Sequence, residues 1–474
     1  MDVADLRREF AEAGQEHVFR FWEELDGAGR ERLRGQLEAV DLDELRSLVE
    51  TLVLSEPSAA EDLSAVEPPT FTALPGHGGD EQGWREARAA GEEALRAGRV
   101  AAFTVAGGQG TRLGFDGPKG TFPLTPVRRA SLFQVFAEKI LSARETYGTE
   151  LPWWIMTSPA NHAATVAFFE ENGFFGLGSG DVHFFPQGML PAVDPDGKLL
   201  LESPSSLALS PDGHGGSLRA LLRSGATAAM AERGIDTISY FQVDNPLENT
   251  VDPAFLGFHL LGGSEMSSKM VAKTDPEEKV GIFVRQGDHL RVLEYSDLPE
   301  EWMRLRDPDG SLRFRAANIA IHVLDRAFVE RVGAKGGDLP VHRAVKRIGV
   351  VDEEGRTVTP EEPNGIKFEM FVFDALPRAR NPLLLETSRA ENFSPVKNAE
   401  GRDSPRTARE DLLRQYTRWL RAAGTGVPLG AEGLPTVNFE ISPLRGFNEH
   451  AFLARPANHH LPSPAEGTVY DGES

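Results

Sequence analysis

Short apolar runs alternate with helical stretches through the centre of the chain, and this alternation constrains the fold more than any other feature. An uninterrupted apolar run of about six residues suits a strand that is buried on both faces of a parallel sheet. Strands that alternate with helices are typical of a doubly wound α/β sheet. The expected strands are 100–105, 153–157, 182–185, 237–243, 268–272 and 315–323, and the expected helices between them are 131–143, 161–171 and 217–233.

The sequence on either side of this region follows other patterns. Residues 1–98 are expected to form a helical N-terminal region with a linker at about 56–80, which is rich in Pro, Gly and acidic residues. The central domain is expected to span 99–390, with an antiparallel hairpin at 281–294 that turns at Gly287-Asp288. Residues 391–474 predict a small C-terminal domain with a poorly ordered tail.

Composition excludes several classes of function. The chain has no cysteine, which excludes disulfides, thiol nucleophiles and Cys-ligated zinc. Its net charge of −22 argues against a nucleic-acid partner. The N-terminus is charged, and no apolar run approaches the roughly 20 residues that a membrane span needs. We therefore expect a soluble, cytoplasmic protein without a nucleic-acid or membrane partner, and the sequence indicates no protein partner.

In so acidic a chain, a phosphate ligand requires a local cluster of cations. Only ten of the 50 basic residues are lysines, so a retained lysine marks a place where the planar guanidinium of arginine would not serve. Lys119, Lys367 and Lys397 all lie in unusual local sequence and are candidates for phosphate contacts.

A glycine-rich turn follows the first expected strand, in the string AGGQGTRLG at 106–114, and GPKG follows at 117–120. Such a turn brings backbone N–H groups against a phosphate or nucleotide. The chain contains no Walker A string, and the glycine spacing is one residue too long for the dinucleotide fingerprint. With Arg112 and Lys119 beside the glycines, the turn suits a triphosphate better than a dinucleotide.

This string resembles the signature of sugar nucleotidyltransferases, in the form found in eukaryote-type UDP-sugar pyrophosphorylases. The resemblance covers roughly residues 100–405, through strings that include WWIMTSPANH, FFPQGMLPAVD, DGHGGSLRAL, YFQVDNPL, LEYSDL, NGIKFEMFVFD and ENFSPVKNAEG. The strings IKFEMFVFD and FSPVKNA are nearest to UDP-N-acetylhexosamine pyrophosphorylases. The resemblance implies a mixed, Rossmann-like nucleotide-diphospho-sugar transferase fold. It also implies Mg²⁺-dependent transfer of a uridylyl group from UTP to a hexose 1-phosphate, with release of pyrophosphate.

The resemblance also implies roles for individual residues. The catalytic cations would be Arg112, Lys119 and Lys397. The nucleotide would lie against Ala106, Gly107, Gly108, Lys119, Gln187, Gly213 and Lys367. The sugar phosphate would be held by His214, Asp244, Gly281, Glu294, Asn318 and Lys397. Asp244 ends an apolar strand, where a carboxylate faces the crevice of an α/β sheet, so it is also the expected Mg²⁺ ligand.

The choice of sugar stays open at this point. Phe368, Phe371 and Phe373 offer aromatic surface to an acetamido methyl group, which favours GlcNAc 1-phosphate or GalNAc 1-phosphate. Hexosamine-type enzymes usually carry Asn where this chain has His214, and Ala317 and Ile321 also depart from the family pattern. The alternative is a UTP-glucose-1-phosphate uridylyltransferase or a UDP-sugar pyrophosphorylase of broad specificity.

Two further alternatives belong to other classes of protein. A nucleotide-sugar glycosyltransferase often has an Asp-x-Asp metal motif, but Asp194-Pro195-Asp196 reads as a turn. A non-catalytic sensor of sugar nucleotides should have lost its phosphate-binding cations, and this chain retains them.

Overall fold

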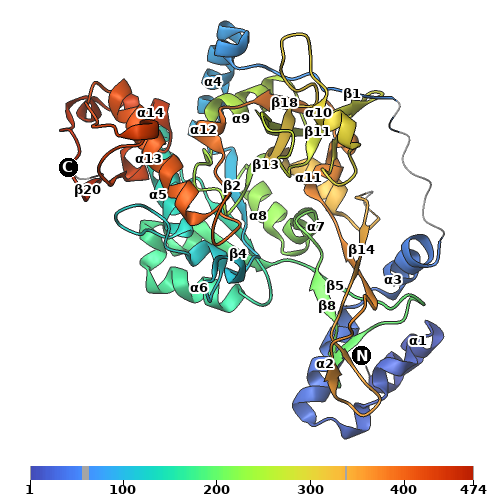
Figure 1. The fold of residues 1–474 in the computed structure, drawn as a ribbon. Helices are drawn as coiled ribbons and strands as arrows, with labels where there is room; N and C mark the ends of the chain where they lie inside the picture. The colour runs from blue at the N-terminus through green and yellow to red at the C-terminus, as the bar shows by residue number, and fades with distance from the viewer. Residues whose placement is uncertain (1, 56–62, 64, 337–338, 473–474) are drawn as a thin grey trace. The chain divides into compact units, whose positions relative to one another are not determined.

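The computed structural model describes residues 2–55, 63, 65–336 and 339–472, which form two compact units (Figure 1). Unit 1 comprises Met1–Ser64, Gln187–Ser217 and Asp338–Asp374, and unit 2 comprises Ala65–Pro186, Leu218–Gly337 and Ala375–Ser474. The chain therefore passes between the units five times, whereas the sequence led us to expect three consecutive domains. Part of the expected linker, at 56–62 and 64, lies outside the described residues. None of the described helices is long and apolar enough to cross a membrane.

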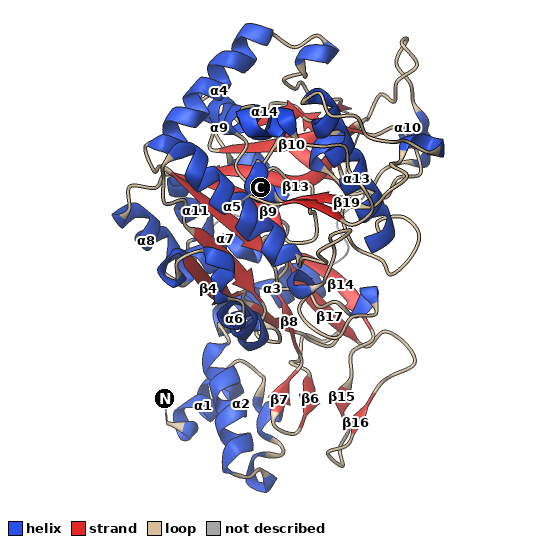
Figure 2. Cartoon of the chain, turned by 90° about the vertical axis from the view of Figure 1, so that its left-hand side faces the viewer, coloured by secondary structure: helices blue, strands red, loops and turns tan. Residues whose placement is uncertain are grey.

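A mixed ten-stranded sheet forms the centre of unit 2, and its strands run between helices in Figure 2. Its parallel part has the order β4-β3-β2-β9, and β13 (Ala316–Asp325) then runs antiparallel to β9. The four parallel strands are β2 (Val100–Val105), β3 (Trp153–Thr157), β4 (Val182–Pro186) and β9 (Thr237–Gln242). The remaining strands are β1 (Val66–Glu67), β10 (Met266–Ala272), β11 (Ile282–Gln286), β12 (His289–Leu293) and β18 (Leu383–Glu386). The predicted doubly wound α/β sheet of mixed direction is confirmed.

The strand order reverses between β2 and β9. Strands β3 and β4 follow β2 on one side, and β9 pairs with β2 on the other. In an open α/β sheet, ligands bind outside the carboxyl ends of the strands at such a reversal. Val105 and Gln242 are partners across these two strands, so the segments that begin at Ala106 and Val243 leave the sheet side by side.

Most of the expected elements of unit 2 form within a few residues of their predicted bounds. The helices are α4 (Glu81–Arg96), α5 (Leu132–Tyr147), α6 (His162–Glu171), α7 (Gly216–Arg223), α8 (Ala226–Glu232), α9 (Pro253–Leu261), α10 (Glu300–Arg304), α11 (Arg326–Gly333), α12 (Arg389–Asn392), α13 (Pro405–Ala422) and α14 (Glu449–Leu453). The predicted hairpin is confirmed: β11 and β12 pair antiparallel, and Gly287 turns between them with φ +59°.

Two expectations for unit 2 are wrong. The single helix predicted over 217–233 is broken, because Gly225 adopts φ +78° and separates α7 from α8. The predicted poorly ordered tail is instead packed as far as it is described, to residue 472, since β20 (Thr468–Tyr470) pairs with β19 (Phe439–Ile441) and the Tyr470 ring is buried. The helix α13 places Tyr416 and Trp419 in the same apolar core as the sheet.

Unit 1 packs helices against short hairpins. Its helices are α1 (Val3–Glu12), α2 (Gly27–Ala39) and α3 (Leu42–Leu48), and the side chain of Asp41 caps α3. Its hairpins are β5 (Met189–Pro191) with β8 (Leu209–Pro211), β6 (Leu201–Ser203) with β7 (Ser206–Leu207), β14 (His342–Lys346) with β17 (Gly365–Glu369), and β15 (Val350–Val351) with β16 (Thr357–Val358). Phe10, Trp22 and Leu37 share one core with Ile366 and Phe368.

Candidate active site

The glycine-rich turn after β2 is a closed loop. Its two arms are joined where Gly110 N donates to Gly117 O at 2.8 Å and Lys119 N donates to Gly108 O at 3.0 Å. A Cβ atom on Gly110 would come within 2.6 Å of the Phe115 ring, so this approach requires glycine. The closure brings Lys119 back beside Gly108 at the carboxyl end of β2.

The buried side chain of Asn161 holds this turn from the neighbouring strand connection. Its amide nitrogen donates to Ala106 O at 3.0 Å and to Gly108 O at 3.3 Å, and its Oδ1 accepts from Ser158 N. The sequence analysis missed this residue, although its place just after the strand 153–157 marks it as part of the same sheet edge.

An ion pair joins the two strands at the reversal of the sheet. The Lys119 ammonium lies 3.2 Å from Asp244 Oδ2, and their side chains are only 17% and 12% exposed. Lys119 comes from the turn after β2, and Asp244 follows β9. The structure therefore brings a predicted phosphate-binding lysine and the predicted metal ligand together. Arg112 is exposed on the turn Thr111–Leu113, where no hydrogen bond or ion pair joins it to another described residue.

The segment that carries Lys397 is attached to the same place. Val396 N donates to Asp244 O at 2.8 Å, and Asn245 fixes the chain just before, because its Oδ1 accepts from Ser394 N. Lys397 is exposed, and its backbone N donates to Asp403 O at 2.7 Å. Lys397, the third predicted catalytic cation, is therefore the residue directly after Val396, which contacts the Asp244 backbone.

Asp403 is a second carboxylate at this point, and the sequence analysis missed it. Burial, together with the charges of Glu278 and Asp244, raises its pKa, and Lys397 opposes that shift. Its φ of +55° is unusual for a residue other than glycine, and such backbone often occurs at functional sites. In the sequence, Asp403 is an ordinary aspartate in a loop before Ser404-Pro405, and nothing around it indicates a role in the site.

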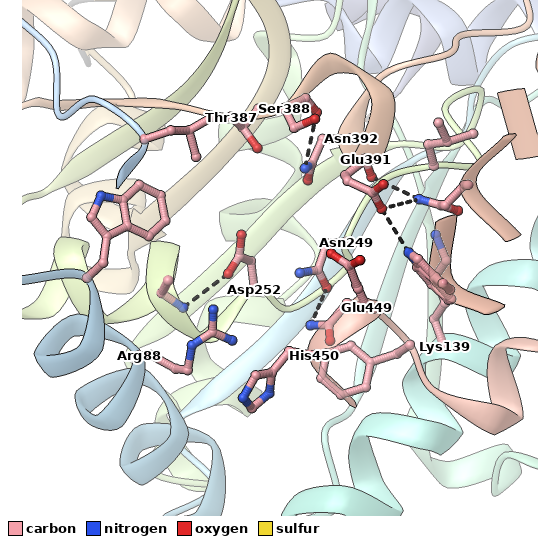
Figure 3. Close-up of a pocket in the computed structure, with 18 residues that line it drawn as sticks. Arg88, Lys139, Asn249, Asp252, Thr387, Ser388, Glu391, Asn392, Glu449 and His450 are labelled. Carbon is pink, nitrogen blue, oxygen red and sulfur yellow. Dashed lines mark hydrogen bonds between the residues drawn. The ribbon is translucent and has the colours of Figure 1, made fainter. Parts of the chain in front are cut away.

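Buried charges support the loop that follows Asp244. The Lys139 ammonium donates to Pro246 O and Glu248 O, each at 2.6 Å, and Lys269 lies 3.0 Å from Asp252. Burial lowers the pKa of Lys139 to about 7 and raises that of Glu248 to about 7. Lys139 and Asp252 also line a pocket of about 200 Å³ that includes none of the predicted site residues (Figure 3). These groups form the scaffold of the loop.

Three further residues of unit 2 that were predicted to bind the sugar phosphate, Gly281, Glu294 and Asn318, also lie together. Asn318 N donates to Gly281 O at 2.8 Å, and a Cβ atom on Gly281 would lie 3.0 Å from Glu294 Oε1. Asn318 Oδ1 accepts from the N–H of Ala320, whose φ is +55°. A strained residue in β13 thus orients the Asn318 side chain. The contact of these residues with a sugar stays a prediction.

Unit 1 contains the remaining predicted site residues. His214 Nδ1 accepts from Val372 N at 3.1 Å, so the neutral ring carries its proton on Nε2. Burial lowers the pKa of His214 to about 4, which keeps the ring neutral at pH 7. Its ring lies 5.4 Å from that of Phe371 and 5.7 Å from that of Phe373. The expectation for Phe368 is wrong, because this ring is fully buried in the core of unit 1 and offers no surface to a ligand.

Gly213 and Gln187 lie close to the same segment of unit 1. Gly213 has φ +82°, and a Cβ atom there would be 2.4 Å from Met370 O. Both the backbone conformation and the lack of space therefore require glycine at this position. Gln187 is followed by Gly188, whose carbonyl accepts from Asp212 N, just before Gly213. Lys367 lies on β17 and lines a cavity of about 420 Å³ with Glu202. Their contacts with a nucleotide stay predictions.

The Asp-x-Asp string of unit 1 is a turn, as the sequence indicates. Asp194 Oδ1 accepts from Asp196 N at 2.9 Å and from Lys198 N at 2.8 Å. A carboxylate that caps its own turn in this way has a structural role. Among the described residues, no group of three His, Cys, Asp or Glu side chains is arranged to hold a metal ion by itself.

Comparisons with known proteins agree with this geometry. The family described as UTP–glucose-1-phosphate uridylyltransferase matches residues 80–412. UDP-N-acetylhexosamine pyrophosphorylase-like protein 1 of Homo sapiens is 39% identical over 483 residues, which cover 94% of this chain and 93% of that protein. UDP-N-acetylglucosamine pyrophosphorylase of Saccharomyces cerevisiae is 36% identical over 450 residues, which cover 90% and 93%. The solved structure of the uridine diphosphate N-acetylglucosamine pyrophosphorylase from Trypanosoma brucei has a TM-score of 0.79 at 28% identity, covering 97% of this chain and 96% of that one.

The depressed pKa of His214 predicts a dependence of stability on pH. Because its folded pKa of about 4 is below the ordinary value of 6.5, the unfolded chain binds a proton between these values that the folded chain does not. The stability is present above pH 6.5 and is lost as the pH falls toward 4. Between pH 7 and pH 5 we expect the wild type to lose about 1–2 kcal/mol more than His214→Asn, measured by urea unfolding. The exposed His289→Asn is the control and should behave as the wild type. Equal losses in wild type and His214→Asn would contradict this account.

Proposed function

The chain belongs to the UTP–glucose-1-phosphate uridylyltransferase family, and from that premise we propose that it joins UTP to an N-acetylhexosamine 1-phosphate and releases pyrophosphate. Relatives that match 90% or more of the chain carry the names of UDP-N-acetylhexosamine and UDP-N-acetylglucosamine pyrophosphorylases. These names support an acetylated sugar over glucose, with GlcNAc 1-phosphate as the main acceptor. A sensor without activity is disfavoured because Arg112, Lys119 and Lys397 are all retained.

One observation carries the proposal for the chemistry: Lys119 and Asp244 meet at the strand reversal of the sheet, 3.2 Å apart. A transfer between two polyanions needs cations and a carboxylate that can hold a metal ion at one place. The glycine-rich turn adjoins Lys119, and the segment of Lys397 is joined to Asp244 by the hydrogen bond from Val396 N to Asp244 O.

The proposed step is a single displacement at phosphorus. A phosphate oxygen of the sugar 1-phosphate attacks the α-phosphorus of UTP, and the bond from that phosphorus to the oxygen of the β-phosphate breaks. Pyrophosphate leaves with the electron pair of that bond, and the step transfers no proton. The protein orients the two phosphates and neutralises their charge, so it needs no nucleophilic side chain. Lys119 and Arg112 would bind the phosphates of UTP, and Lys397 would meet the charge that develops on the transferred group.

The residues at this point fit a magnesium ion. Mg²⁺ usually retains several waters and is held by one or two carboxylates together with substrate phosphates. Asp244 supplies one such carboxylate, and Asp403 lies near enough for the charge of Asp244 to raise its pKa. The bound ion would neutralise part of the negative charge of the α-phosphate and of the sugar phosphate. Asp244 would hold it, and Lys119 would then be released from its ion pair to bind phosphate.

The first prediction concerns Asp244. Asp244→Asn keeps the size of the side chain and removes the charge, so we expect turnover to fall by about 10²-fold or more and the response to Mg²⁺ to weaken. Asp196→Asn is the matched control, because Asp196 lies in the Asp-x-Asp turn of unit 1. Wild-type rates and a full Mg²⁺ response in Asp244→Asn would exclude it as the metal ligand. Loss of activity in Asp196→Asn would instead favour a glycosyltransferase-like metal site.

The second prediction concerns Lys397. If its ammonium meets charge that develops in the transition state, Lys397→Ala should lower kcat more than it raises KM for UTP. Lys397→Arg should restore activity only in part, because the guanidinium is longer and planar. The exposed Lys346→Ala in unit 1 serves as the control. A variant impaired only in KM would make Lys397 a contact of the ground state.

The third prediction tests the sugar. Release of pyrophosphate from UTP should be most efficient with GlcNAc 1-phosphate or GalNAc 1-phosphate, and less so with glucose or galactose 1-phosphate. If His214 contacts the 2-substituent, His214→Asn should shift kcat/KM further toward the acetylated sugars, since an amide both donates and accepts hydrogen bonds. A tenfold advantage of glucose 1-phosphate in the wild type would overturn the hexosamine assignment.

A further inference from the structure

A second cavity of unit 2 is lined by three cationic side chains and two carboxylates. It has a volume of about 530 Å³, within the range of small-molecule sites, and none of the predicted catalytic or sugar-binding residues lines it. Its polar walls include Lys273, Thr274, Arg306, Ser311 and Arg315. Phe71 and Leu312 add apolar surface.

Lys273 is the central feature of this cavity. It directly follows β10, its backbone N donates to Arg315 O at 2.7 Å, and only 3% of the residue is exposed. In the part of the chain that the structure describes, no hydrogen bond and no ion pair within 4 Å involves its ammonium. Burial lowers its pKa. Lys273 is almost fully enclosed and lines the cavity, so a group that enters the cavity from outside the chain could pair with its ammonium.

The acidic residues that follow Lys273 in sequence are held by arginines. Asp275 pairs with Arg402 at 2.9 Å, and Glu278 pairs with Arg389 at 2.9 Å. Glu277 pairs with Arg304. These carboxylates attract the Lys273 ammonium from a distance, yet each makes its close contact with an arginine.

The two carboxylates that line the cavity are held in place by hydrogen bonds and keep their charge. Glu386 accepts from Leu74 N at 3.0 Å and from His77 Nδ1 at 2.8 Å. Asp309 Oδ1 accepts from Ser311 N and from Ser311 Oγ. The cations Lys273, Arg306 and Arg315 face the cavity together with these two carboxylates. Arg315 contacts Asp307, and Arg306 donates to a backbone carbonyl.

We propose that this cavity is a second ligand site, distinct from the catalytic centre, that binds the phosphoryl group of a small molecule through Lys273, Arg306 and Arg315. A compact ammonium and two guanidinium groups are the cations that bind phosphate in proteins. The volume exceeds that of a phosphate ion, so the remainder of a phosphorylated molecule would lie against Phe71 and Leu312. The proposal does not depend on the function of the catalytic centre.

The test is isothermal titration calorimetry with inorganic phosphate and with a hexose 6-phosphate. It is performed on Lys119→Ala protein, in which the predicted catalytic centre has lost a phosphate contact. We expect both phosphates to bind to the Lys119→Ala protein. Adding Lys273→Met should weaken their affinity at least tenfold, and adding Arg306→Gln, at an exposed residue, should weaken it several-fold. Lys346→Met, on β14 of unit 1, should have no effect. Tighter binding of the hexose phosphate would identify a phosphorylated metabolite as the ligand, and equal binding would identify inorganic phosphate.

Three results would overturn the proposal. Phosphate binding that disappears in Lys119→Ala alone would place the only phosphate site at the catalytic centre. Binding that Lys273→Met and Arg306→Gln leave unchanged would show that these cations do not hold it. Absence of binding at millimolar phosphate would exclude the site. Because Arg306 is exposed, its substitution gives an answer even if Lys273→Met impairs folding.

Discussion

The contact between Lys119 and Asp244 depends on one constraint, which is the parallel pairing of β2 with β9. This pairing makes two segments far apart in sequence leave the sheet at the same edge. Each group of the ion pair is nearly buried, and each would be costly there without the other. We interpret the pair as the arrangement of the protein without substrates. Lys119, which we propose to bind phosphate, and Asp244, which we propose to bind the metal ion, then neutralise each other. The supporting contacts of Asn161, Lys139 and Val396 then keep both side chains in place.

Much of the fold could be predicted from the sequence because its signals are local. The run 100–105 and the hairpin turn at Gly287 each report the conformation of a few adjacent residues. The break at Gly225 was missed because glycine is tolerated within helices, and nothing nearby in sequence shows a left-handed φ. The division into two units could not be predicted, since it depends on contacts between segments more than a hundred residues apart.

The candidate site likewise contains residues that could be predicted from the sequence and residues that could not. The glycine-rich turn and the strand end at Asp244 are visible in sequence, and the structure shows in addition that Lys119 and Asp244 meet. Asp403 and Asn161 were missed, because an ordinary Asp and an ordinary Asn gain their roles only through tertiary contacts. Three lysines that were not among the predicted site residues, Lys139, Lys269 and Lys273, are buried. Their burial depends on tertiary contacts, so it could not be predicted from the sequence around them.

The central claim is that uridylyl transfer occurs in one displacement at the Lys119–Asp244 centre, without a covalent enzyme intermediate. The most direct measurement uses UTP with a sulfur atom at the α-phosphate in one configuration, and determines the configuration of the UDP-sugar product. A single in-line attack predicts inversion at the α-phosphorus. Retention would require two displacements through an enzyme-bound nucleotide, and would contradict the account.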